Sequence, residues 1–135
     1  DHDRLFAESD FVSIHVPLTE QTHQLVGESE LQAMSDDAVL INTSRGEVVD
    51  SAALDRALEE GWIFNTGLDV TDPEPLPEDH TLQKHIGTDL IVTPHIGSAS
   101  LQTRNKMADM TTKNLLAGLA GESLPNSAIS DIGSQ

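Results

Sequence analysis

The stretch VLINTSRGEVVDSAALDRALEEGWIFNTGLDV, residues 39–70, decides the fold class. It opens with a β-rich run at 39–44, continues with a stripe of apolar residues at helical spacing within 51–62, and closes with a second β-rich run at 63–70. Gly61 stands where the helix should end. A strand, a helix and a strand in this order are typical of a crossover unit, which joins two parallel strands.

The flanking segments repeat the alternation. The patterns predict further strands at 11–18 and 90–97, and helices at 5–10, 28–38 and 98–122. Three prolines within 71–82 remove backbone donors, so this stretch is predicted to be a loop. The long helix carries Leu101, Met107, Met110, Leu115 and Leu119, which are available for packing. We therefore predict an α/β fold with a mostly parallel sheet and a long C-terminal helix.

The composition excludes several classes of partner. Its 23 acidic residues outnumber 7 basic ones, which gives the 135-residue chain a formal net charge of -16. Such a charge repels nucleic-acid phosphates and anionic lipids, and the acidity fits either a salt-adapted source or an ordinary solvated surface. The longest apolar run, AVLI at 38–41, is far shorter than the ~20 residues that span a bilayer. We expect a cytoplasmic protein that binds neither nucleic acid nor a membrane.

Metal and thiol chemistry find little support in the sequence. The chain has no cysteine, so disulfides, a thiol nucleophile and cysteine metal sites are excluded. His80 and His85 flank the segment TLQK, but no companion ligand stands at zinc-site spacing. We expect both histidines to be surface residues and predict no metal site.

Polar residues follow the predicted strands at their carboxyl ends. Arg45 follows one strand, Glu74 lies in the proline-rich loop after the next, and His95 follows the last. Each alone has an ordinary explanation: a surface ion pair, a solvated loop carboxylate and a structural cap. Because ligands of open α/β sheets bind beyond the carboxyl ends of the strands, the three together predict a functional site.

These residues carry a resemblance to a known family. The run LINTSRGEVVDSAALDRALEEGWIFNTGLDVTDPEPLP, followed by IVTPHIGSAS, resembles the D-isomer-specific 2-hydroxyacid dehydrogenases, and residues 69–122 most resemble glyoxylate and hydroxypyruvate reductases. The resemblance implies the second half of a Rossmann-type NAD(P)-binding domain in 1–98, a connecting helix at 99–121 and a tail at 122–135. The G-x-G-x-x-G phosphate loop is absent, so we expect a C-terminal fragment that is inactive alone.

The resemblance also assigns catalytic roles. His95 donates the proton when a 2-keto acid is reduced, and histidine suits this task because it titrates near working pH. Glu74 stabilises the imidazolium and orients the ring. Arg45 binds the substrate carboxylate, since a planar guanidinium can donate two parallel hydrogen bonds.

Further contacts are implied position by position. The cofactor-binding residues are Val16, Pro17, Thr22, Thr43, Ser44, Arg45, Asp69 and Gly97, and the substrate-binding residues are Arg45, His95, Ile96, Gly97 and Ser98. Two alternatives stay open: Pro17 could simply end an edge strand, and Asp69 could be a local turn acceptor. The glycines that follow Arg45 and His95 would leave room for a ligand close to the backbone. The expected cofactor is NAD(P)H, with a tilt toward NADPH.

The preferred function is reduction of glyoxylate or hydroxypyruvate by a parent enzyme that we expect to be a homodimer. Two alternatives remain, a dinucleotide-sensing corepressor of the same fold and a related enzyme such as phosphoglycerate dehydrogenase. Formate dehydrogenase is disfavoured, because that branch pairs its histidine with an amide, whereas the residue here is Glu74.

Overall fold

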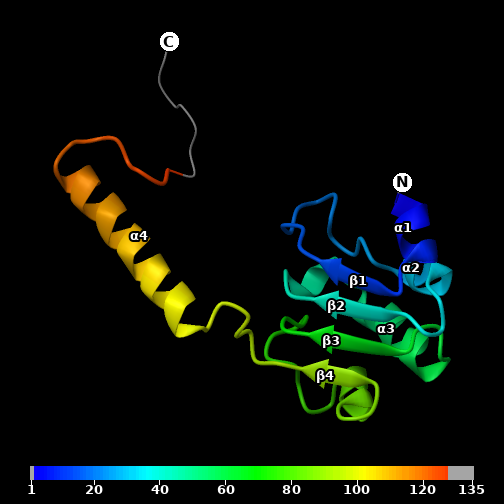
Figure 1. Cartoon of the computed structure of the whole chain (residues 1–135). Helices are drawn as coiled ribbons and strands as arrows, with labels where there is room; N and C mark the ends of the chain where they lie inside the picture. The colour runs from blue at the N-terminus through cyan, green and yellow to red at the C-terminus, as the bar shows by residue number, and fades with distance from the viewer. Residues whose placement is uncertain (1, 128–135) are drawn as a thin grey trace. The chain divides into compact units, whose positions relative to one another are not determined.

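The structure, a computed structural model, describes residues 2–127. By its internal contacts the chain divides into two compact units, the first ending at Ile96 and the second beginning at Gly97. The first unit contains a four-stranded sheet in the order β1-β2-β3-β4, with every neighbouring pair parallel (Figure 1). The strands are β1 Phe11–Ile14, β2 Val39–Asn42, β3 Asn65–Leu68 and β4 Leu90–Val92. The predicted fold class is confirmed.

An α-helix connects β1 to β2 and another connects β2 to β3, whereas β3 and β4 are joined by the predicted loop and a 3₁₀ turn. The first unit contains α1 His2–Glu8, α2 Glu28–Ala33 and α3 Ser51–Glu59, with two 3₁₀ turns, η1 Gly46–Val48 and η2 Thr81–His85. The second unit contains α4 Leu101–Leu119. All four strands are shorter than predicted, because the last residues of each β-rich run leave the sheet to form the turns that carry polar side chains. The turn η2 was not predicted at all.

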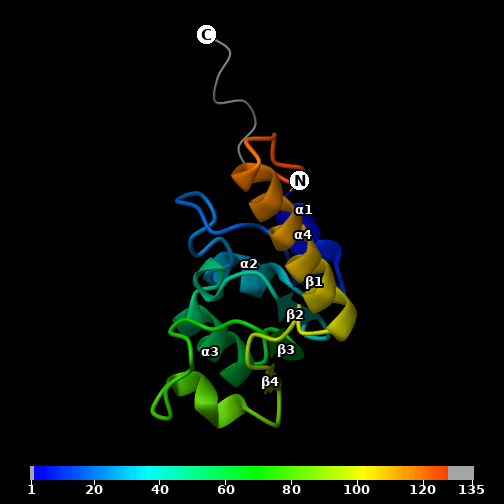
Figure 2. The ribbon, with the colours of Figure 1, turned by 90° about the vertical axis from the view of Figure 1, so that its left-hand side faces the viewer.

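The hydrophobic core lies on one face of the sheet. The register places Val12, Leu40, Thr66 and Leu90 in one row, and all four are buried. Figure 2 shows α2 and α3 together on one side of the strands, and α2 contacts both α1 and α3. The carboxyl ends of the strands therefore extend from a sheet that is packed against helices, which fixes their positions.

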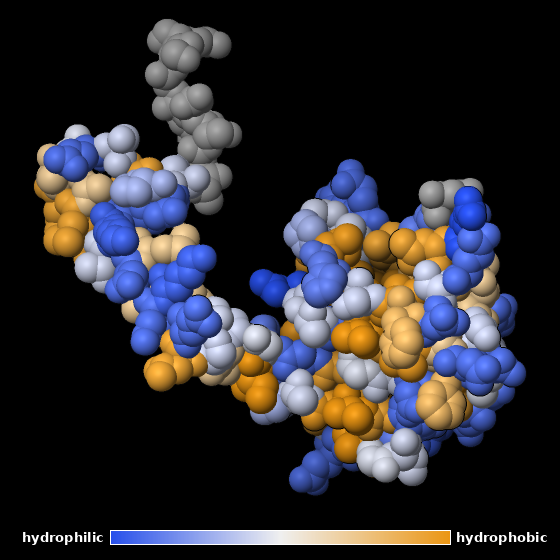
Figure 3. All heavy atoms as spheres, viewed as in Figure 1, coloured by the Kyte–Doolittle hydropathy of each residue, from blue (hydrophilic) through white to orange (hydrophobic). Residues whose placement is uncertain are grey.

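The opposite face of the sheet is apolar and exposed. Ser13, Ile41, Gly67 and Ile91 form a row on it, and Ile91 is 69% exposed, as is Phe11 at 71%. Figure 3 shows hydrophobic side chains gathered over the strands on this face. Parallel sheets are normally covered on both faces. The exposed face of this sheet is therefore a surface against which a further layer of structure could pack.

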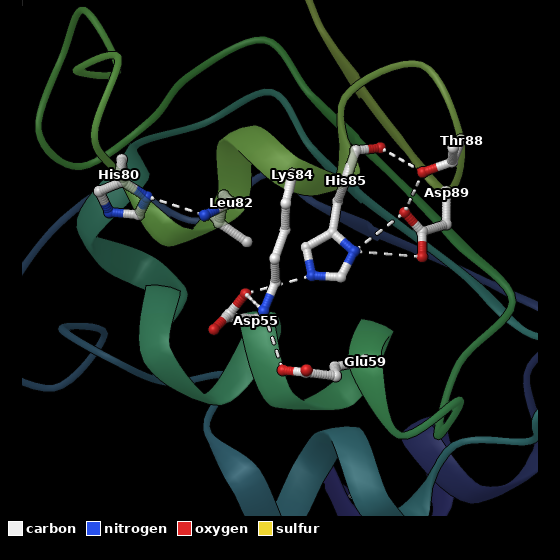
Figure 4. Close-up of polar contacts among 8 residues, drawn as sticks. All are labelled: Asp55, Glu59, His80, Leu82, Lys84, His85, Thr88 and Asp89. Carbon is white, nitrogen blue, oxygen red and sulfur yellow. Dashed lines mark hydrogen bonds and ion pairs between the residues drawn. The ribbon is translucent and has the colours of Figure 1, made fainter.

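The prediction for the loop histidines is wrong for His85. It is buried, with its Nδ1 3.1 Å from Asp89 Oδ1 and its Nε2 3.1 Å from Asp55 Oδ1 (Figure 4). Lys84 joins the same carboxylate of Asp55 at 3.2 Å. His85 thus ties η2 to α3 and to the turn before β4, whereas His80 is partly exposed. Within residues 2–127 no group of three or more His, Cys, Asp or Glu side chains is arranged to hold a metal ion.

The helix α4 exposes the apolar side chains that the sequence marks as available for packing. Of these, Leu101, Leu115 and Leu119 are the most exposed, and Leu116, which the sequence analysis did not single out, is exposed as well. No helix in the described part of the chain has the length and apolar character needed to cross a bilayer. The domain boundaries proposed at residues 98 and 121 stay predictions.

Candidate active site

A pocket of about 410 Å³ opens at the carboxyl ends of β3 and β4. Glu74 and His95 line it together with Asp69. Leu76 and Val92 supply part of its apolar wall. A pocket with an apolar wall and a few convergent polar groups is the usual form of a small-molecule site.

Glu74 and His95 form a hydrogen-bonded pair in this pocket. His95 Nδ1 lies 2.8 Å from Glu74 Oε1, and the two side chains are 50% and 43% exposed. A carboxylate at this distance orients the imidazole. Because Nδ1 faces the carboxylate, Nε2 is the ring nitrogen left to exchange a proton with a bound molecule. The arrangement can perform general acid–base chemistry.

Asp69 lies at the end of β3 and is buried. Its Oδ1 accepts a hydrogen bond from the Thr93 hydroxyl at 2.5 Å and another from the Ile96 backbone N–H at 2.9 Å. Of the two roles left open by the sequence, the local acceptor is the one that the structure contains. The cofactor contact of Asp69 stays a prediction.

Arg45 lines a second hollow of about 420 Å³, at the carboxyl ends of β1 and β2. Val16, Pro17, Thr43 and Ser44 line it as well. The exposed guanidinium donates from Nη1 to the Ser44 carbonyl at 2.6 Å. The structure therefore groups Arg45 with predicted cofactor residues and not with the residues that line the pocket of Glu74 and His95.

The remaining predicted site residues do not line either hollow. Thr22 donates from its hydroxyl to the Pro17 carbonyl at 2.6 Å, so it shapes the loop after β1. Ile96 is half exposed. Gly97 and Ser98 belong to the second unit, so their contacts with a ligand stay predictions.

The sequence reasoning missed Asn42, which shapes the turn that carries Arg45. This side chain is 1% exposed; its Oδ1 accepts from the Ser44 N–H and hydroxyl, and its Nδ2 donates to the Arg45 carbonyl at 2.8 Å. A buried amide with all these partners fixes the backbone around it. The available signal was an asparagine directly after the apolar residues of β2.

Gly46 is required by protein packing, which corrects the expectation that a ligand needs this space. A Cβ on Gly46 would lie 2.1 Å from the carbonyl oxygen of Thr71, far inside any real contact. The turn after β2 thus packs directly on the loop that leads to Glu74. Ser51 adds a hydrogen bond from its hydroxyl to the Asp72 carbonyl at 3.2 Å.

The variant Gly46→Ala should destabilise the chain strongly. The added Cβ must push the backbone of Thr71 away, and overpacking of this kind costs about 1–3 kcal/mol. Gly67→Ala is the matched control, because a Cβ there has nothing within 4 Å. The free energy of unfolding from urea denaturation checks both variants. Equal stability of the two would contradict the close packing of the loops.

A parallel α/β sheet with polar groups gathered beyond the carboxyl ends of its strands is typical of ligand-binding α/β domains, among them the Rossmann-type nucleotide-binding domains. The comparison with known families makes this class specific, since the NAD binding domain of the D-isomer specific 2-hydroxyacid dehydrogenases matches residues 1–97. The chain therefore belongs to the D-isomer specific 2-hydroxyacid dehydrogenases, and the resemblance read from the sequence is confirmed.

Individual relatives agree with this family. A glyoxylate reductase from Korarchaeum cryptofilum is 51% identical over 124 residues, which are 92% of this chain and 37% of the relative. The solved structure of an NADPH-dependent glyoxylate/hydroxypyruvate reductase from Sinorhizobium meliloti, in complex with NADP and malonate, is 38% identical with a TM-score of 0.83 and matches 94% of this chain and 39% of its own.

A third relative carries the other cofactor. The NAD-complexed D-isomer specific 2-hydroxyacid dehydrogenase from Lactobacillus delbrueckii ssp. bulgaricus is 33% identical with a TM-score of 0.82, over 91% of this chain and 40% of that one. The chain thus spans between a third and a half of the length of each of these relatives.

Proposed function

We propose that the chain is part of a reductase that converts glyoxylate or hydroxypyruvate to the 2-hydroxy acid with a nicotinamide cofactor. The observation that carries the proposal is the hydrogen-bonded pair of Glu74 and His95 in a pocket at the carboxyl ends of β3 and β4. The names of the relatives from K. cryptofilum and S. meliloti support the substrate class.

The chemistry divides between the cofactor and the protein. The reduced cofactor, when bound, supplies the hydride for the carbonyl carbon. His95, protonated, donates its Nε2 proton to the carbonyl oxygen as that oxygen becomes an alkoxide, and Glu74 holds the ring through its Nδ1 during the transfer. In oxidation the neutral imidazole takes the proton back. Arg45 holds the substrate carboxylate with two parallel hydrogen bonds.

The residues present fit a dinucleotide. The hollow at the ends of β1 and β2 and the pocket at the ends of β3 and β4 lie along the carboxyl edge of one sheet, where dinucleotides bind. The residues assigned to the cofactor are Val16, Pro17, Thr22, Thr43, Ser44, Arg45, Asp69 and Gly97, and those assigned to the substrate are Arg45, His95, Ile96, Gly97 and Ser98. The proposed cofactor is NAD(P)H. One relative was solved with NAD and another with NADP. The relative from S. meliloti is NADPH-dependent, which supports a slight preference for NADPH in this proposal.

The exposed apolar face of the sheet supports a larger parent protein. Phe11 and Ile91 would be covered there by the other half of the dinucleotide-binding domain, which is consistent with the greater length of the relatives. In this proposal residues 1–98 complete that domain and 99–121 connect to a substrate domain, while the predicted tail at 122–135 extends beyond the described residues, which end at 127. The parent is a cytoplasmic homodimer, and the isolated chain is inactive because it lacks the phosphate-binding turn.

A steady-state assay of the full-length protein tests the proposal. Loss of the absorbance of NADH or NADPH on addition of glyoxylate or hydroxypyruvate is the expected result, with phosphohydroxypyruvate as the competing substrate for a phosphoglycerate dehydrogenase. Tight cofactor binding without turnover of any 2-keto acid would instead indicate a corepressor-like binding protein and overturn the enzyme proposal.

A further inference from the structure

We propose that Asp69 is a positioning residue, which holds the backbone at His95 so that its imidazole meets Glu74. The inference rests on the proposed function, because it matters only if His95 transfers a proton. Asp69 acts through the turn that carries the histidine and not on the reacting atoms.

The backbone at His95 needs such support. Its φ is 53°, in the left-handed region that side chains other than glycine adopt infrequently. Residues held in this region persist only where surrounding contacts over-determine them, and they gather at functional sites. The only other non-glycine residue with positive φ among the described residues is Gln24, in the loop before α2.

The carboxylate of Asp69 supplies contacts on both sides of that residue. A single oxygen, Oδ1, accepts from the hydroxyl of Thr93 before the histidine and from the N–H of Ile96 after it. Asp69 is buried, and a hydrogen bond in a buried environment is stronger than the same bond in water. The two contacts therefore close a clamp around residues 94 and 95.

The clamp is anchored in the sheet. Asp69 donates from its backbone N–H to the Asn42 carbonyl at 2.9 Å, and Thr93 donates to the Leu68 carbonyl at 2.8 Å. The turn at residues 93–96 is thus fixed to the sheet at Thr93 and, through Asp69, at Ile96. A site built on strands is held more precisely than one on a free loop. Glu74 approaches from a different loop, so the 2.8 Å contact requires the histidine to be held independently.

Two variants of the full-length enzyme test the role. Asp69→Ala removes the clamp and should lower kcat at saturating cofactor about 10²-fold, the effect of a misplacement of about 1 Å. Asp69→Asn keeps an oxygen acceptor at Oδ1 and should recover most of kcat. A kcat at saturating cofactor that is unchanged in Asp69→Ala, or that Asp69→Asn fails to recover, would overturn the inference.

A second measurement does not depend on turnover, so it also distinguishes failure of the clamp from failure of the proposed function. Glycine adopts positive φ without strain, so it needs no clamp at position 95. In thermal unfolding of this chain, Asp69→Ala should raise the unfolding equilibrium constant about fivefold more when residue 95 is His than in the His95→Gly background. Equal effects in the two backgrounds would overturn the inference, even if the parent enzyme is active.

Discussion

Replacing His95 by Gln in the full-length form of the proposed reductase should lower kcat for reduction by about 10²–10⁴-fold, the usual contribution of general acid–base catalysis. Glutamine keeps a polar side chain opposite Glu74 but cannot transfer a proton at working pH. Cofactor binding should change little. The measurement is steady-state reduction of glyoxylate with saturating cofactor.

His23→Gln is the matched control for this prediction, because that histidine is exposed in the loop between β1 and α2. It should leave kcat unchanged. If His95→Gln retained the parental kcat, His95 would not be the proton donor, and the pocket would have to serve another purpose.

Arg45→Lys should raise the substrate KM about 10–100-fold, since lysine keeps the charge but loses the two-pronged donor geometry. The guanidinium is exposed and makes its nearest described contact with the adjacent Ser44 carbonyl, so it is available to a ligand. The Kd for the cofactor should stay within a few-fold. Initial-rate kinetics with varied glyoxylate and a cofactor titration separate the two quantities.

Arg4→Lys is the control for charge alone, because Arg4 pairs with Glu8 on the surface of α1. Its kinetics should match those of the parent. Unaltered substrate KM in Arg45→Lys would contradict the assignment of Arg45 to the substrate carboxylate.

The order of strands and helices could be predicted from sequence because each element carries its own periodic pattern. The ends of the strands could not. Asn42 reads as one more residue of a β-rich run, yet its side chain hydrogen-bonds to Ser44 and Arg45 and turns the chain out of the sheet. Whether a polar residue continues a strand or organises the turn after it depends on contacts that a local pattern does not contain.

Some features of the candidate site could likewise be predicted from the sequence, and others could not. A parallel sheet brings the ends of its strands to one edge, so Glu74 and His95 could be expected near each other from topology and from family resemblance. The positive φ of His95, the close approach of Gly46 to Thr71 and the burial of His85 depend on tertiary packing. Glycine after Arg45 suggested room for a ligand, but the space is filled by another loop of the same chain.

The most direct test of the central claim is a double-mutant cycle in the full-length protein, with Glu74→Gln, His95→Gln and the variant that carries both changes. Glutamine at position 74 replaces the carboxylate that contacts His95 Nδ1 with a neutral amide, whose hydrogen bond is weaker. If Glu74 acts through His95, Glu74→Gln should lower kcat for reduction in the parent but have almost no further effect in the His95→Gln background. Steady-state reduction of glyoxylate at saturating cofactor measures all four proteins. Losses of kcat that multiply in the double variant would contradict the claim that Glu74 and His95 act as a pair.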